Sequence, residues 1–170
     1  MLGVWHFSFT VSDLDAAVDF YTRILGFECI HRQQQSNEYT RRLVGYPDAD
    51  LRIAQLVIPG QPRGLSTHDL ELVQYVAPHG ERGDFNICNP GQAHLALAVE
   101  SMDEEYSRLV EAGVEFFSEP NLITAGVNEG GYTVYFYGFD RLVHELVQPP
   151  KARTEEYRAR SGLPAAMPAP

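Results

Sequence analysis

The sequence has few cysteines and few basic residues, and each shortage excludes a class of protein. Cys29 and Cys88 are the only cysteines and neither belongs to a Cys-x-x-Cys pair, which argues against a disulfide scaffold and a zinc knuckle. Lysine and arginine number 13 against 23 acidic residues, so the net charge is −10. Because neutralising phosphates supplies most nucleic-acid affinity, no nucleic-acid partner is expected.

Long apolar runs are also missing. No run approaches the roughly 20 residues that a membrane-spanning helix needs, so no membrane partner is expected. The first residues lack a basic stretch followed by an apolar core, so no signal peptide is expected. Together with the two unclustered cysteines, this predicts a cytoplasmic protein. The 170 residues, 44% of them hydrophobic, are enough for a compact globular domain.

The sequence repeats one pattern in its two halves. Residues 6–11 (His-Phe-Ser-Phe-Thr-Val) and 94–99 (His-Leu-Ala-Leu-Ala-Val) both alternate like strands and both begin with histidine. Residues 71–74 and 145–148 are both Glu-Leu-Val-Gln, and each copy closes its half. Because side chains alternate across a strand, each histidine lies on the less bulky face of its segment. The repeat predicts two equivalent structural units in tandem.

A helix is expected after the first strand of each half. The first helix has a cap at Ser12 or Asp13 and ends at Gly26. The second has a capping-box serine at Ser101 and ends at Gly113. Each helix leads into a further strand, which gives both halves a strand–helix–strands order.

The halves differ by one insertion. The two histidines lie 88 positions apart and the two glutamates 74, so the first half carries 14 extra residues. The polar stretch 32–50, after a strand predicted at 27–31, is the place for them, and residues 38–44 within it have a helical pattern. We predict one domain over residues 1–149. It consists of a first module at 1–76, a connector at 77–91 and a second module at 92–149, followed by a Pro/Ala-rich tail at 150–170 with room for one short helix.

Two histidines and two glutamates occupy equivalent positions of the two halves: His6, Glu71, His94 and Glu145. A lone histidine in a strand is usually a core or surface residue, but here the same pattern occurs twice in the same order. If the two units pair about a pseudo-two-fold axis, the four side chains can converge on one point. Two imidazoles and two carboxylates suit a divalent zinc, nickel, cobalt, manganese or ferrous ion, and the two negative charges offset that of the ion.

The remaining histidines are His31, His68, His79 and His144, and none of them has a counterpart in the other half. His144 precedes Glu145 on the same predicted strand, so its side chain is expected on the opposite face. We therefore leave these four histidines out of the predicted site.

The segments around these residues resemble the vicinal oxygen chelate superfamily, also called the glyoxalase/bleomycin resistance/dioxygenase family. The resemblance covers about residues 3–149 and is carried by residues 6–17, 20–27, 70–75, 90–94 and 144–148. It implies an α+β fold in which two tandem βαβββ modules form a cupped mixed sheet around a metal site. The family's usual ligands, on the first and last strand of each module, map onto His6, Glu71, His94 and Glu145. A homodimer is also expected.

One departure from the family pattern precedes the last strand. Relatives often carry an Asp-Pro-Asp-Gly turn there, whereas residues 137–141 of this sequence are Tyr-Gly-Phe-Asp-Arg. We interpret this turn as structural, so the departure bears on the rim of the pocket and leaves the metal site in place.

The resemblance leaves three functions open. Lyases, isomerases and epimerases like glyoxalase I use four protein ligands and move a proton next to a metal-bound carbonyl or vicinal oxygens of a small molecule. Extradiol dioxygenases hold Fe(II) with two histidines and one glutamate, here His6, His94 and Glu145, and Glu71 would then occupy a position that oxygen needs. A metal-free antibiotic-binding protein would need an aromatic cleft, for which the aromatic residues of 132–139 are candidates. We favour the proton-transfer enzyme, with Glu145 as the base and Glu71 as its counterpart.

Overall fold

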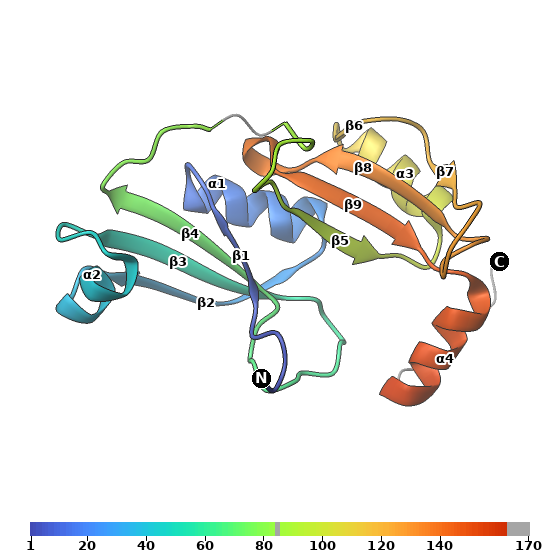
Figure 1. Ribbon diagram of the computed structural model, residues 1–170, viewed down its shortest axis with the longest axis horizontal. Coiled ribbons are helices and arrows are strands. Elements are labelled where there is room, and N and C mark those ends of the chain that lie inside the picture. Colours follow the sequence, from blue (N-terminus) through green and yellow to red (C-terminus); the bar gives the residue numbers. More distant parts are fainter. Residues whose placement is uncertain (84–85, 163–170) are drawn as a thin grey trace. The chain divides into compact units, whose positions relative to one another are not determined.

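The computed structural model describes residues 1–83 and 86–162, and the chain divides into two compact units between residues 85 and 86 (Figure 1). The first unit contains β1 (Phe7–Thr10), α1 (Leu14–Asp19), the π-helical turn η1 (Phe20–Ile24), β2 (Glu28–Gln35), α2 (Glu38–Val44), β3 (Asp50–Val57) and β4 (Leu70–Ala77). The second contains β5 (His94–Ala98), α3 (Met102–Glu111), β6 (Glu115–Phe116), β7 (Asn121–Leu122), β8 (Tyr132–Tyr137), the 3₁₀ turn η2 (Phe139–Arg141), β9 (Val143–Gln148) and α4 (Lys151–Ser161).

Each unit is built on one mixed sheet, and the two sheets have corresponding strand orders. The first sheet has the order β1-β4-β3-β2 and the second the order β5-β9-β8-β6, with β7 also paired to β8. In both sheets the first strand of the unit is parallel to the last, and the other pairs are antiparallel. The predicted α+β fold with two βαβββ modules is confirmed. Its assignment to a single domain over residues 1–149 stays a prediction.

The glutamine of the repeated Glu-Leu-Val-Gln segment has the same structural role in both units. Gln74 Oε1 accepts a hydrogen bond from the backbone N–H of Leu14, at 3.3 Å, where α1 begins. Gln148 Oε1 accepts one from the backbone N–H of Met102, at 2.6 Å, where α3 begins. The first N–H groups of a helix have no partner inside the helix. In each unit the last strand therefore supplies an acceptor to the start of that unit's helix.

The predicted helix caps are confirmed. The Asp13 carboxylate accepts from the N–H groups of Asp15 and Ala16, and the Ser101 hydroxyl accepts from the N–H of Glu104. The apolar faces of these helices turn inward, since α1 lies against β3 and β4 and α3 against β9 (Figure 1). Their fully buried side chains lie with those of the strands: Leu14, Tyr21, Leu56 and Leu72 in the first unit, and Met102, Leu109, Phe136 and Leu146 in the second.

Two parts of the sequence interpretation change in the structure. Strand β2 continues to Gln35 instead of ending at His31, because it is the edge strand and its polar side chains pair with β3 while remaining near solvent. The insertion proper is therefore shorter than predicted, although its helix over residues 38–44 is confirmed as α2. The tail forms α4, and residues 84–85 of the connector and 163–170 of the tail lie outside the described residues.

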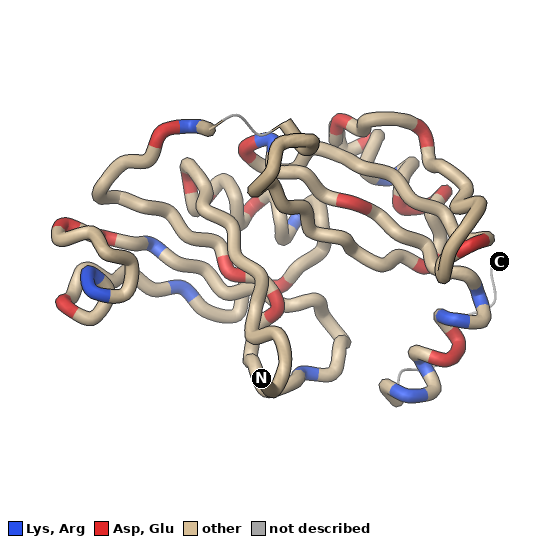
Figure 2. The backbone as a smooth tube through the Cα atoms, viewed as in Figure 1, with Lys and Arg blue, Asp and Glu red and all other residues tan. Residues whose placement is uncertain are grey.

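Acidic and basic residues are interspersed along both units, including α4 (Figure 2). In the described ranges, no helix is both long and apolar enough to cross a membrane.

His144 lies on the core face of β9, as its position next to Glu145 predicts. It is fully buried, its ring centroid is 5.2 Å from that of Phe136, and its Nδ1–H donates to the carbonyl of Leu142 at 2.9 Å. A Cβ at Gly138 would lie 2.6 Å from His144 Cε1, so this position of the turn requires glycine. Burial lowers the pKa of His144 to about 4; the charge of His94 adds to this, and the bond to Leu142 opposes it.

We expect this buried histidine to make the protein lose stability in mild acid. The unfolded chain takes up a proton at position 144 near pH 6.5, whereas the folded protein does so only near pH 4. Protonation at this position therefore leaves the free energy of unfolding unchanged well above pH 6.5. As the pH drops from 6.5 towards 4, it lowers the free energy of unfolding, by about 3 kcal/mol at most. Urea unfolding with a chelator present, between pH 4.5 and 7.5, measures the loss.

The matched control is His144→Leu, because leucine (Leu70) stands at the equivalent position of the first unit and is buried there. Its stability should depend less on pH than that of the wild type, since the carboxylates titrate in both proteins. Equal pH dependence in the two proteins would contradict the prediction.

The strand-to-helix hydrogen bond of Gln148 should contribute about 1 kcal/mol to the free energy of unfolding. Gln148→Met keeps the size of the side chain and removes the acceptor for Met102 N–H, so it should lose that amount. Gln148→Glu keeps an acceptor and should lose much less, because a carboxylate is also favoured at a helix N-terminus. Equal losses in the two variants, measured by urea unfolding, would show that the hydrogen bond is not the source.

Candidate metal centre

In the first unit, His6, just before β1, lies next to Glu71 of the parallel strand β4. Ser8 of β1 is opposite Glu71 of β4, and His6 comes two residues before Ser8, on the same face. His6 Nε2 is 3.8 Å from Glu71 Oε1. The first unit therefore joins its predicted histidine and glutamate into one pair.

The second unit contains the same pair at the same register. Ala96 of β5 is opposite Glu145 of β9, and His94 comes two residues before Ala96. His94 Nε2 is 3.2 Å from Glu145 Oε2. In both units the same imidazole nitrogen faces the carboxylate. The two glutamate side chains are similarly enclosed, with 17% and 16% of their surface exposed.

These donor atoms fit a divalent ion. The separation of His94 Nε2 and Glu145 Oε2 is close to that of two ligands which each lie about 2.1 Å from one ion. Imidazole nitrogen and carboxylate oxygen together suit zinc and its first-row neighbours. Each pair belongs to its own unit, and the convergence of both pairs on one ion stays a prediction.

The two glutamates have different neighbours. The Thr133 hydroxyl on β8 donates to Glu145 Oε1 at 2.5 Å. Tyr135, opposite Glu145 on β8, meets the His94 ring edge-on with the ring centroids 5.2 Å apart. Burial raises the pKa of Tyr135, and the negative charge of Glu145 raises it further, so the phenol stays protonated.

The corresponding positions opposite the first unit's last strand have different chemistry. On β3 they are Ile53, which replaces the threonine, and Gln55, which replaces the tyrosine. Isoleucine has no hydroxyl to donate, so the equivalent of the Thr133 bond is missing for Glu71. The scaffold repeats, but the surroundings of its two carboxylates do not.

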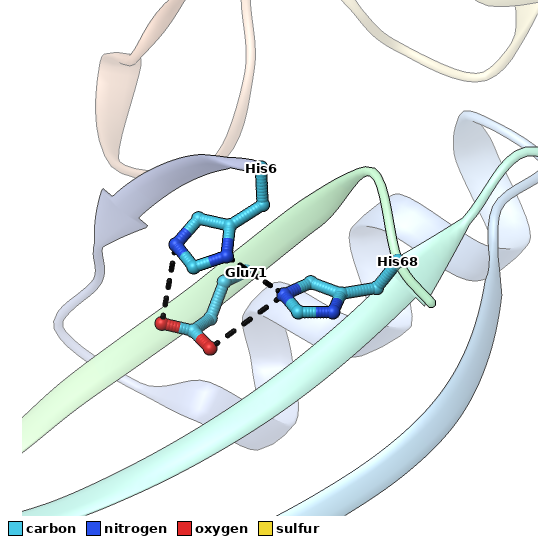
Figure 3. A group of neighbouring side chains, drawn as sticks. All are labelled: His6, His68 and Glu71. Atoms are coloured by element: carbon cyan, nitrogen blue, oxygen red, sulfur yellow. Dashed lines mark hydrogen bonds and ion pairs between the residues drawn. The ribbon is translucent and has the colours of Figure 1, made fainter. Parts of the chain in front are cut away.

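His68 joins the first pair, although the sequence analysis left it out of the site (Figure 3). It is buried just before β4; its Nε2 is 2.9 Å from His6 Nδ1 and 3.8 Å from Glu71 Oε2. The candidate ligand atoms of these three residues all lie within 4.8 Å of one another. Burial lowers the pKa of His68, helped by His6 and opposed by Glu71 and Asp69.

The sequence contained one signal for His68, namely its place three residues before Glu71. The equivalent residue of the second unit is Leu142, so the repeat of the two halves does not identify His68. The other unassigned histidines lie elsewhere: His31 is exposed beside Gln33, His79 is exposed, and His144 is in the core.

Comparisons with known proteins identify the family of the chain. The family model described as Glyoxalase/Bleomycin resistance protein/Dioxygenase superfamily matches residues 3–137. A 2-epi-5-epi-valiolone epimerase from Actinomyces sp is 36% identical over 140 residues, which are 79% of this chain and 73% of that protein.

Solved structures share the fold. A glyoxalase family protein from Bacillus cereus has a TM-score of 0.72 at 22% identity, covering 88% of this chain and 95% of its own. A fosfomycin resistance protein from Listeria monocytogenes, solved with Mn(II) and a sulfate ion, has a TM-score of 0.52 at 20% identity and covers 91% and 98%. By its family match, the epimerase relative and its fold, the chain belongs to the glyoxalase/bleomycin resistance protein/dioxygenase superfamily.

Proposed function

We propose that this protein is a divalent-metal-dependent epimerase or isomerase that moves a proton at a carbon next to a carbonyl group of a small molecule. The observation that carries the proposal is the same histidine–glutamate pair at the same register in both units, which offers four protein ligands. The relative that is named an epimerase supports the choice of reaction. Lyase chemistry of the glyoxalase I type remains within the same proposal, because it also begins with a proton transfer.

His6, Glu71, His94 and Glu145 would hold the ion, and their chemistry admits zinc, nickel, cobalt, manganese or Fe(II). When bound, the ion supplies Lewis acidity that makes a carbon next to a substrate carbonyl more acidic. In this proposal Glu145 takes the proton from that carbon. Glu71, in the equivalent place of the other unit, returns a proton, and inversion results if the two carboxylates face opposite sides of the substrate.

The neighbours of Glu145 support its assignment as the base. Thr133 donates to Oε1, which leaves Oε2 on the side of His94 Nε2 and fixes the direction of the carboxylate. Positioning of this kind lowers the cost of reaching the reacting geometry. Tyr135, protonated and opposite Glu145, is a donor available to a substrate oxygen on the same face.

Features of the two units count against the alternatives. In a dioxygenase with His6, His94 and Glu145 as ligands, Glu71 would have to stay off the iron, yet it lies beside His6. Metal-free sequestration needs no metal ligands, yet each unit presents a histidine–glutamate pair. Cytoplasmic location and a homodimer belong to the proposal as expectations from the cysteines and the family.

The first test is hydrogen exchange on a ketone. The probe is 2-epi-5-epi-valiolone, which the name of the epimerase relative suggests as a substrate. In D₂O the protein should introduce deuterium at a carbon next to the ketone, because the removed proton is replaced from solvent. Mass spectrometry detects the mass increase, and elemental analysis of protein purified without added metal identifies the ion.

A chelator should abolish this exchange, and one of the five ions should restore it. Protein that retains none of these ions on purification and binds none of them when they are added would contradict the proposed metal dependence. This measurement of metal binding does not depend on which ketone is the true substrate.

The second test separates proton transfer from oxygen chemistry through Glu71. Glu71→Ala removes an anionic ligand, so metal affinity should fall by more than about tenfold. Exchange should remain lost even when excess metal refills the site. Glu145→Ala is the control, because it should be damaging under both functions. If the Glu71 variant keeps Fe(II) and cleaves a catechol ring in air but not under argon, the protein is a dioxygenase.

A further inference from the structure

His6 presents its two ring nitrogens to different partners. Nε2 faces Glu71 Oε1, while Nδ1 lies 2.9 Å from His68 Nε2 (Figure 3). In the second unit, His94 likewise turns Nε2 towards its glutamate. The nitrogen that both units direct at a carboxylate is therefore Nε2, which leaves Nδ1 of His6 to His68.

The position of the protons follows from this arrangement. A neutral imidazole has one N–H and one nitrogen lone pair. If His6 offers the lone pair of Nε2 to an ion, its proton is on Nδ1 and is donated to His68 Nε2. His68 must then carry its own proton on Nδ1.

The surroundings of His68 indicate that it does more than fill space in the core. His68 is buried, and among the described residues its Nδ1 has no hydrogen-bond partner. A buried donor without a partner is unfavourable for folding, so packing alone does not account for this histidine. The equivalent residue Leu142 shows that the scaffold accepts an apolar side chain at this position.

We propose that His68 is a positioning residue, which accepts the hydrogen bond from His6 Nδ1–H and so holds His6 with Nε2 free and directed at the ion. This inference rests on the proposed function, since it requires His6 to be a ligand. Hydrogen-bond partners of metal-bound histidines fix the tautomer and ring orientation, and their loss typically costs about 10- to 100-fold in metal affinity. With Leu142 in its place, the second unit has no such partner for His94 at this position.

Direct binding of the ion by His68 is the rival role. The 2.9 Å between His68 Nε2 and His6 Nδ1 is a hydrogen-bond distance, and it is also a separation that two ligands of one ion have. The two roles differ in what a glutamine at position 68 would do.

The test compares His68→Leu, His68→Gln and the wild type. Leucine removes the acceptor and reproduces the residue of the second unit, whereas the glutamine oxygen can still accept from His6 Nδ1–H. His31→Gln is the control, because it removes an exposed imidazole that contacts Gln33 and lies outside the site. Affinity for Zn²⁺ and for Mn²⁺ is measured by competition with a chromophoric chelator, and circular dichroism monitors folding.

We expect His68→Leu to bind both ions about 10- to 100-fold more weakly, His68→Gln to recover most of the affinity, and His31→Gln to equal the wild type. Long-range ¹H–¹⁵N spectra of the metal-free protein should place the His6 proton on Nδ1 in the wild type and in His68→Gln. In His68→Leu the proton should shift towards Nε2, while the His94 signals stay unchanged as an internal reference.

Each other outcome overturns the inference. Unchanged affinity and an unchanged His6 tautomer in His68→Leu exclude the positioning role. Equal loss in the leucine and glutamine variants makes His68 a direct ligand instead. If His68→Leu does not fold, a wild-type His6 proton on Nε2 is still sufficient to reject the proposal. A wild type that binds neither ion contradicts the proposed function itself, a result that the affinity measurements distinguish from the others.

Discussion

The parallel pairing of the first and last strand in each unit is the interaction on which the rest depends. It sets Ser8 against Glu71 and Ala96 against Glu145, and so it brings each preceding histidine to a carboxylate. Three residues beyond each glutamate, the same strand delivers a glutamine to the start of the unit's helix. A one-residue change of register would turn the glutamates to the opposite face. Fold and candidate site therefore share one ladder of backbone hydrogen bonds.

Much of this was predictable because the sequence contains the pattern twice. The repeat identified the two histidine–glutamate pairs, and local chemistry identified the caps Asp13 and Ser101. The length of β2 was not predictable from apolar alternation, because an edge strand tolerates consecutive glutamines that read as a loop. His68 was not predicted, because the prediction relied on residues that occur in both halves and the equivalent of His68 is Leu142. Its contact with His6 depends on tertiary structure, because the two lie 62 residues apart.

The symmetric scaffold thus carries asymmetric chemistry. Glu145 is held by a threonine hydroxyl and lies opposite a protonated tyrosine, whereas Glu71 lies beside a buried histidine and opposite a glutamine. The Thr133 hydroxyl fixes the direction of the Glu145 carboxylate, whereas Ile53 in the equivalent place offers Glu71 no such bond. The proposed epimerisation likewise assigns the two carboxylates different roles.

The glutamine contacts connect each helix to the strand that carries the candidate glutamate of its unit. Glu71 and Gln74 are three residues apart on one strand, a span of about 10 Å, and Gln74 also donates to the carbonyl of Ser12 just before α1. A tilt of that helix would therefore pull on the strand that carries the carboxylate. In each unit one amide side chain therefore joins the start of the helix to the strand that carries the candidate glutamate, three residues away.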